Sequence, residues 1–250
     1  RAQLVALAIE FDFFVFADDV YHLLDWSPTP VERLVALDPA YIAATDAPVD
    51  LNYDPAADAD PTYTGGEAPA EATAARVVSV SSFTKILAPG LRVGWLEAAP
   101  ALVDRLAARG YVVSGGGVAP LASQISSRVV ASGDLDACLA TTCANYKRRC
   151  DALLAACDAA SDVLEPLCRP TGGFFVWCRL KGGISATALL EACAGEVAFL
   201  AGGACDSGGD ALGGAAALDE HVRLCFTMYD EVDLAEGVAR IARAARRISV

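Results

Sequence analysis

The 250-residue sequence lacks any apolar run of the roughly 18 residues that a membrane-spanning helix requires; its densest short stretch is Phe11 to Phe16. No signal peptide is visible, because the chain opens on Arg1 and passes directly into helical spacing. These absences predict no membrane partner and a cytoplasmic location. Organelle targeting stays open, since an N-terminal part of the protein is expected to be missing.

Histidine is almost absent, with only His22 and His221, and the nine cysteines include no Cys-x-x-Cys pair. A zinc-type cluster is therefore not expected, and no metal site is predicted. The cysteines are scattered and odd in number, which indicates a reducing compartment rather than a disulfide scaffold. Four of them fall in one helical stretch and are expected to act as small apolar residues: Cys138, Cys143, Cys150 and Cys157.

Basic residues are missing from residues 34–75. This stretch is rich in Pro, Ala, Asp and Gly, and is expected to be a solvated acidic loop insertion with little order. Its acids account for much of the net charge of −13, so the charge is a weak functional signal. A chain this acidic is not expected to bind nucleic acid. The acids are Asp38, Asp46, Asp50, Asp54, Asp58, Asp60, Glu67 and Glu71.

Lysine is scarce as well, since only Lys85, Lys147 and Lys181 occur. Lys85 follows an apolar run at 77–81 that predicts a buried strand, and Arg92 comes after a Pro-Gly turn. Unlike a guanidinium, a lysine amine can be tuned by burial to attack a carbonyl and form a Schiff base. A lone lysine is more often a snorkelling surface residue, so the role of Lys85 depends on the rest of the chain.

Four segments of the sequence occur in the order found in one enzyme family. They are Phe16-Ala-Asp18-Asp19-Val20-Tyr21, then Ser82-Phe-Thr-Lys85 with Pro89-Gly90-Leu91-Arg92 and Gly94-Trp95, then Arg169 to Trp177 and Val222 to Phe226. This set resembles the fold-type I pyridoxal-phosphate-dependent aminotransferases of class I/II. Within that class it is most similar to 2-aminoadipate and aromatic aminotransferases and to the aminotransferase-like domains of MocR regulators.

The resemblance implies that pyridoxal 5'-phosphate is the cofactor and that Lys85 forms the Schiff base with it. Lys85 would also carry the proton between the substrate Cα and the cofactor. Ser82 and Arg92 would hold the phosphate through a hydroxyl and a planar guanidinium, and Thr84 would add a contact.

The acid that faces the ring nitrogen is Asp18 or Asp19 on the residues alone, because both follow the first strand. The family's Asp-x-x-Tyr spacing selects Asp18, with Tyr21 donating to the phenolic oxygen of the ring. Without the family, a helix-capping aspartate beside a packed tyrosine is the plainer interpretation. Arg223 alternates with apolar residues in a strand pattern. The resemblance implies that it binds the α-carboxylate of the amino-acid or 2-oxo-acid substrate, and a structural salt bridge is the alternative.

The coarse pattern predicts an α/β class. Residues 1–133 are expected to form the C-terminal half of a large cofactor-binding domain, with a mostly parallel sheet flanked by helices. Residues 134–250 are expected to form a long linking helix and a small α+β domain. The strand at 13–17 is expected to be buried on both faces. Gly172 and Gly173 are expected to allow a close approach to the strand that carries Trp177. Further strands are expected at 76–82, 92–97, 163–168, 173–180, 197–200 and 221–227. Helices are expected at 2–10, 100–109, 119–131, 134–160, 186–194 and 231–247.

The family pattern is incomplete here, because the stretch that precedes the Asp-x-x-Tyr strand in these enzymes is missing. We therefore expect a fragment of a longer protein, with a homodimer implied by the resemblance. Three hypotheses stay open: an aminotransferase that moves an amino group between an amino acid and a 2-oxo acid, a non-catalytic cofactor-sensing domain of a transcription regulator, and an inactive truncated aminotransferase.

Overall fold

The structure, a computed structural model, describes residues 1–45, 75–115, 119–206 and 217–248. The chain divides into two compact units, residues 1–23 with 29–138 and residues 24–28 with 139–250. The predicted domain boundary at residues 133 and 134 stays a proposal. Within the described ranges, no helix is long and apolar enough to cross a membrane.

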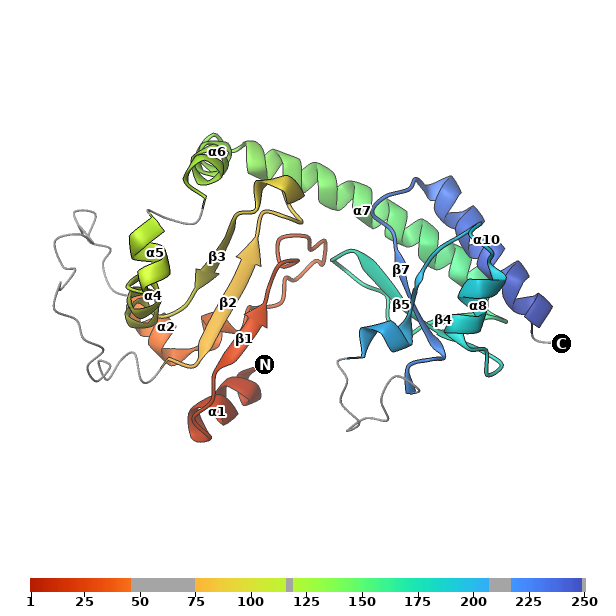
Figure 1. Cartoon of the computed structure of the whole chain (residues 1–250), viewed down its shortest axis with the longest axis horizontal. Helices are drawn as coiled ribbons and strands as arrows, with labels where there is room; N and C mark the ends of the chain where they lie inside the picture. Colours follow the sequence, from red (N-terminus) through yellow and green to blue (C-terminus); the bar gives the residue numbers. More distant parts are fainter. Residues whose placement is uncertain (46–74, 116–118, 207–216, 249–250) are drawn as a thin grey trace. The chain divides into compact units, whose positions relative to one another are not determined.

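The first unit is built on a three-stranded sheet in the order β1-β2-β3 (Figure 1). The strands are β1 Val15–Asp18, β2 Val77–Ser82 and β3 Gly94–Glu97. β1 runs parallel to β2, whereas β3 runs antiparallel to it. The antiparallel return follows from the short connection 83–93, because a parallel crossover needs about a dozen residues or more. The expected α/β class and these strands are confirmed.

Helices cover parts of both faces of this sheet. α1 and η1 contribute Val5 and Val35, which pack against Val77 on one face. α4 contributes Leu102, which packs with Val78 on the opposite face. The helical segments of the unit are α1 Ala2–Glu10, η1 Val35–Leu37, α2 Pro39–Thr45, η2 Pro89–Leu91, α4 Pro100–Ala107, α5 Gly110–Gly115 and α6 Pro120–Ala131.

The expectation that the first strand is buried on both faces is wrong for the described residues. Ala17 is buried, but the Phe16 side chain, on the other face, is 72% exposed. β1 lies at the edge of the three-stranded sheet, and α4 packs over Val78 further into the sheet. A continuous apolar run therefore predicted the strand correctly but not its surroundings.

The acidic stretch 34–75 is also corrected in its first part, because residues 35–37 and 39–45 form η1 and α2. Asp38 is fully buried rather than solvated. Its carboxylate accepts backbone N–H groups from Ala40 at 3.0 Å and from Arg76 and Val77 at 2.8 Å each. Asp38 thus joins the start of α2 to the start of β2. Residues 46–74 of the predicted loop lie outside the described residues.

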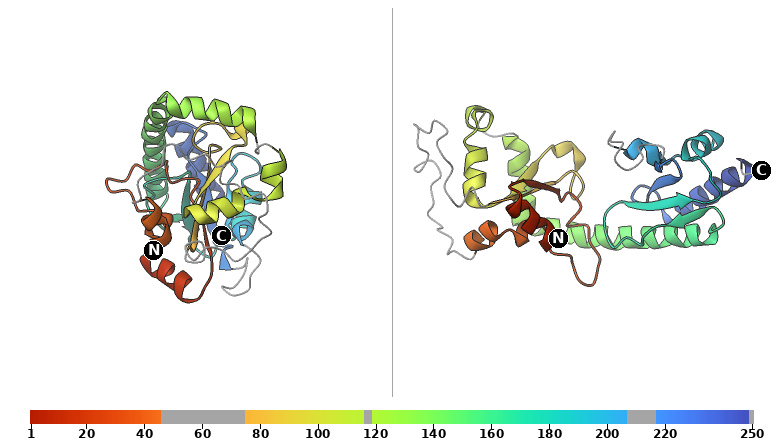
Figure 2. Two further views of the ribbon diagram at one scale, coloured as in Figure 1. Left: turned by 90° about the vertical axis from the view of Figure 1, so that its left-hand side faces the viewer. Right: turned by 90° about the horizontal axis from the view of Figure 1, so that it is seen from below.

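The second unit is an antiparallel sheet in the order β4-β5-β7-β6 with helices, which confirms the expected α+β character. The helix α7 runs without a break (Figure 2), and a core of its apolar residues, the strands and α10 includes Leu153, Val176, Val222 and Ile241. The elements are α7 Asp134–Ala159, β4 Leu164–Pro166, β5 Phe175–Leu180, α8 Ala186–Ala192, β6 Leu200–Ala201, η3 Gly202–Cys205, β7 His221–Cys225 and α10 Glu231–Ile248.

The cysteines of α7 follow the expected apolar role in part. Cys150 and Cys157 are buried in the core of the second unit, whereas Cys138 is exposed. Burial raises the pKa of the Cys150 thiol to about 11, so this group stays protonated at neutral pH. Cys150 is therefore a core residue rather than a reactive thiolate.

Gly172 makes a close approach, but to a different neighbour from the expected one. A Cβ at this position would lie 2.5 Å from the carbonyl oxygen of Leu24. Asp25 and Gly172 form an isolated β-bridge, so the contact is with the segment 24–25 and not with the strand of Trp177. Glycine is needed here because any side chain would push the two backbones apart.

Candidate active site

Lys85 lies in the tight connection between β2 and β3. The carbonyl of Phe83 accepts backbone N–H groups from Leu87 at 2.9 Å and Ala88 at 3.1 Å, which closes the turn around the lysine. The Phe83 N–H donates to the Val93 carbonyl at 3.0 Å, and this bond continues the β2–β3 pairing into the loop. A short, hydrogen-bonded loop places Lys85 just beyond the carboxyl end of β2, the edge at which α/β sheets bind ligands.

Hydroxyl and guanidinium groups gather at the base of the same loop. Ser82 Oγ lies 2.7 Å from Thr84 Oγ1 and accepts the Thr84 backbone N–H at 3.0 Å. Arg92 Nη1 donates to Thr84 Oγ1 at 3.4 Å and to the Pro89 carbonyl at 3.1 Å. The structure therefore brings the predicted phosphate residues Ser82, Thr84 and Arg92 together in one cluster.

The backbone of Arg92 is left-handed, with φ 53° and ψ 35°. A residue other than glycine in this region costs about 1–2 kcal/mol. Such strain persists where the surrounding structure requires the residue, and it often marks a functional position. The left-handed backbone of Arg92 places its guanidinium beside Thr84 Oγ1 and the Pro89 carbonyl.

Gly94 begins β3 directly beside this cluster. A Cβ there would lie 2.8 Å from the Ser81 carbonyl oxygen, closer than real Cβ atoms approach. Any larger residue would push β3 away from the end of β2, where Gly94 pairs with Ser82. The glycine in the Gly94-Trp95 pair thus allows β2 and β3 to stay paired up to the loop that carries Lys85.

Tyr21 and Lys85 come from different segments and meet in the first unit. Lys85 Nζ lies 5.9 Å from the centroid of the Tyr21 ring, within the range of a cation–π interaction. Tyr21 follows β1 and Lys85 follows β2, and these strands are parallel neighbours. The parallel pairing brings the two carboxyl ends, and so the two side chains, to the same edge of the sheet.

The two adjacent aspartates after β1 have different surroundings. Asp18 pairs in register with Val80, and strand alternation puts it on the same face as Ser82. It is exposed. The Asp19 carboxylate instead accepts a hydrogen bond at 2.6 Å from the hydroxyl of Ser79, on the opposite face. The structure therefore separates two residues that the sequence alone leaves equivalent.

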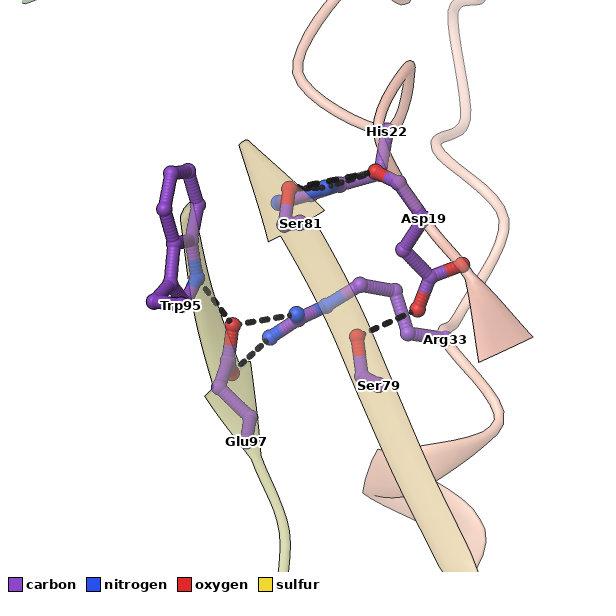
Figure 3. A network of polar contacts seen from close by, with 7 residues as sticks. All are labelled: Asp19, His22, Arg33, Ser79, Ser81, Trp95 and Glu97. Atoms are coloured by element: carbon purple, nitrogen blue, oxygen red, sulfur yellow. Dashed lines mark hydrogen bonds and ion pairs between the residues drawn. The ribbon is translucent and has the colours of Figure 1, made fainter. Parts of the chain in front are cut away.

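A polar network that the sequence did not reveal lies on the Ser79 face (Figure 3). Arg33 and Glu97 form a bidentate ion pair at 2.6 and 2.7 Å, with 26% of each side chain exposed. Trp95 Nε1 donates to Glu97 at 3.1 Å, and the Trp95 ring packs 4.9 Å from that of Phe83. The hydrogen bonds from Arg33 lower the pKa of Glu97, so this carboxylate stays charged. Trp95 thus connects the ion pair to Phe83, at the start of the loop that carries Lys85.

Arg223 lies in the second unit, in β7, opposite Trp177 of β5. Its guanidinium carbon is 4.1 Å from the centroid of the Phe175 ring, and it lines a cavity of about 540 Å³ with Phe175, Cys225 and Tyr229. Among the residues that the structure describes, no carboxylate forms an ion pair with Arg223. The predicted alternative, a structural salt bridge, thus has no support in the described ranges.

The residues of the first unit fit pyridoxal 5'-phosphate by their chemistry. An amine, a phenol and an exposed carboxylate lie at or just past the carboxyl ends of neighbouring strands, beside two hydroxyls and a guanidinium suited to a phosphate. In the described parts of the chain, no group of three or more His, Cys, Asp or Glu side chains is placed to hold a metal ion.

Comparison with known proteins identifies the family of the chain. Residues 2–241 match the family model for aminotransferase class I and II. The chain is 28% identical to an aromatic-amino-acid aminotransferase of Thermococcus litoralis over 98% of its own length and 49% of the relative. A kynurenine aminotransferase of Pyrococcus horikoshii has a similar structure, with a TM-score of 0.72 and 26% identity over 98% of this chain and 50% of the other.

A third similar protein is the α-aminoadipate aminotransferase of Thermus thermophilus, solved as a complex with N-(5'-phosphopyridoxyl)-L-leucine. Its TM-score is 0.69 at 25% identity, over 98% of this chain and 53% of the other. The chain thus spans about half the length of the relatives that it matches. The match to the family model nevertheless covers nearly all of the present sequence. The chain belongs to the class I and II aminotransferases.

Proposed function

We propose that the protein that carries this chain is a pyridoxal-phosphate-dependent aminotransferase, which moves an amino group between an amino acid and a 2-oxo acid. The observation that carries the proposal is the position of Lys85. It lies near Tyr21, in a closed loop after β2 whose ends carry the cluster of Ser82, Thr84 and Arg92. The family and the names of the relatives support the same activity. They favour transamination over a regulatory, cofactor-sensing role.

The residues of the first unit would hold the cofactor as follows. Arg92, Ser82 and Thr84 would bind its phosphate through charge-assisted hydrogen bonds. Asp18 would keep the ring nitrogen protonated, and Tyr21 would donate to the phenolic oxygen. When bound, the cofactor supplies a ring that withdraws electrons from the substrate Cα.

Lys85 has two tasks in this proposal. Its Nζ would hold the cofactor covalently. When free, the same amine would take the proton from the substrate Cα and carry it to the cofactor. Both tasks require an amine that can attack a carbonyl and exchange a proton, which a lysine provides and an arginine does not. Replacing Lys85 with arginine would therefore keep a charge but lose both tasks.

Arg223 would bind the substrate α-carboxylate through its planar fork. Its contact with Phe175 leaves the guanidinium oriented beside a cavity rather than paired with a described carboxylate. The names of the relatives suggest aromatic amino acids and 2-aminoadipate as the first substrates to test. A homodimer belongs to the proposal through the family resemblance.

The proposal is tested by measuring amino-group transfer from these amino acids to a 2-oxo acid in the protein that carries this chain. The wild type and a Lys181→Ala control, which changes an exposed lysine, are expected to be active. Lys85→Ala is expected to lose several orders of magnitude in kcat. Activity that survives Lys85→Ala would refute the mechanism. Cofactor binding by the isolated 250-residue chain tests separately whether these residues are sufficient.

A further inference from the structure

Asp19 has no part in the proposed contacts with the cofactor, yet hydrogen bonds fix both its side chain and its backbone. Its carboxylate accepts the Ser79 hydroxyl at 2.6 Å, and the Ser79 side chain is almost fully buried, with 1% exposed. A buried hydroxyl without a partner would cost free energy, so this bond has a structural value of its own. It joins the end of β1 to the middle of β2.

The backbone of Asp19 is fixed as well. Its N–H donates to the Val80 carbonyl at 2.9 Å, and its carbonyl accepts the His22 N–H at 3.0 Å. The His22 ring also contributes, because Nδ1 lies 2.6 Å from the same carbonyl oxygen and must be its donor. Ser81 Oγ lies 3.4 Å from that oxygen and completes the network on this face (Figure 3).

These bonds enclose the turn from Asp18 to His22. Asp18 immediately precedes the fixed residue, and Tyr21 lies between Asp19 and His22, which are joined by two hydrogen bonds. A rotation of this turn would move both Asp18 and Tyr21, since Asp18 is directly bonded to Asp19 and only Val20 separates Asp19 from Tyr21. A site of this kind requires its contacting groups to be held within a fraction of an ångström by their supporting bonds.

We propose that Asp19 is a positioning residue, which uses its hydrogen bond with Ser79 to set the directions in which Asp18 and Tyr21 face the cofactor. This inference rests on the proposed function and assigns a role to a side chain on the opposite face of the sheet from Ser82. The Asp-Asp pair in the sequence thus has two tasks: Asp18 contacts the ring, and Asp19 holds the turn.

The first test measures hydrogen exchange of the amides in residues 19–22, without added cofactor, in the protein that carries this chain. Ser79→Ala and Asp19→Ala are expected to speed this exchange about tenfold, because the turn opens locally. Ser126→Ala is the matched control: Ser126 is also a buried serine of the first unit, but it bonds to Ala122 of its own helix. Unchanged exchange in both Ser79→Ala and Asp19→Ala would overturn the proposal.

The second test compares kcat, cofactor affinity and the pH at which the bound cofactor changes its absorbance. Ser79→Ala and Asp19→Ala are expected to lower kcat about tenfold or more and to shift that pH, with cofactor affinity within a few-fold of wild type because the phosphate residues are untouched. The double variant should be no worse than either single one. Asp19→Asn keeps an oxygen acceptor for Ser79 and should restore most of kcat.

Two results of the second test would contradict the positioning role. They are an Asp19→Asn variant as impaired as Asp19→Ala, or additive losses in the double variant. Failure of the proposed function is a separate result: a wild-type protein that binds no cofactor and transfers no amino group. The exchange experiment needs no cofactor, so it distinguishes the two failures.

Discussion

Lys85 Nζ lies 5.9 Å from the centroid of the Tyr21 ring. Two effects of Tyr21 can therefore be separated by substitution. Tyr21→Phe removes only the hydroxyl, and the loss of one hydrogen bond is expected to weaken cofactor binding about fivefold. Tyr21→Leu also removes the ring contact with Lys85 and should weaken it further. Cofactor titration checks the order, and equal affinities for the two variants would show that the ring contact has no energetic role.

Because the backbone of Arg92 is left-handed, replacing this residue with glycine should relieve backbone strain but weaken cofactor binding. Glycine adopts this conformation without strain, so Arg92→Gly should be about 1 kcal/mol more stable to unfolding than Arg92→Ala. Both variants should lose cofactor affinity by about 10- to 100-fold, because a charge-assisted hydrogen bond is gone. Arg92→Lys should fall between them and the wild type, since it keeps the charge without the planar fork. Denaturant unfolding and cofactor titration measure both effects, and an Arg92→Gly variant less stable than Arg92→Ala would contradict the backbone argument.

Asp38 should be among the most sensitive positions for the folding of the first unit. Its buried carboxylate accepts three backbone N–H groups, from Ala40, Arg76 and Val77. Asp38→Ala leaves these donors buried and unpaired, so we expect a loss of about 2–4 kcal/mol in the free energy of unfolding. Asp206→Ala, at the C-terminal end of η3 in the second unit, is a control expected to have little effect. A stable Asp38→Ala variant would mean that residues 34–45 do not support β2.

The Arg33–Glu97 pair predicts a definite pH dependence of stability. Hydrogen bonds from Arg33 lower the pKa of Glu97 below its ordinary value of 4.5, so the folded protein releases this proton more readily than the unfolded chain. The stabilisation is therefore complete above about pH 4.5 and is lost as the pH falls through the lower, folded pKa. Glu97→Gln should cost about 1 kcal/mol at neutral pH and nearly nothing in acid.

Unfolding curves of wild type and Glu97→Gln between neutral and acidic pH measure this difference. Glu165→Gln is the matched control, because Glu165 pairs with Arg179 at an exposed position where solvent screens the interaction. Its effect should be smaller at every pH. A Glu97→Gln difference that grows on acidification would contradict the assigned pKa shift.

Local patterns predicted most of the helices and strands, whereas the family resemblance supplied the candidate site residues of the first unit. The apolar run before Lys85 and the Pro-Gly turn are features of short segments, and short segments set strands and turns. The Asp-x-x-Tyr spacing, in contrast, has a meaning only through the resemblance to the family. The resemblance implied the shared role of Ser82, Thr84 and Arg92, and their closeness follows from their positions at the two ends of one short loop.

Interactions between distant segments could not be predicted in this way. The pairing of Arg33 with Glu97, and of Asp38 with the start of β2, depends on how elements pack, and no local spacing records it. The burial of Asp38 was not predicted, because the acidic composition of residues 34–75 indicated a solvated loop. Ser79 and Ser81, two hydroxyls alternating with valines in an otherwise apolar strand, were the one available signal of a polar network on this face.

The most direct test of the central claim is to find which lysine binds the cofactor. The protein that carries this chain is mixed with pyridoxal 5'-phosphate, reduced with borohydride, digested and analysed by mass spectrometry. We predict a phosphopyridoxyl group on the peptide that contains Lys85 and none on those that contain Lys147 or Lys181. A folded, cofactor-binding protein without modification at Lys85 would contradict the assignment of this site.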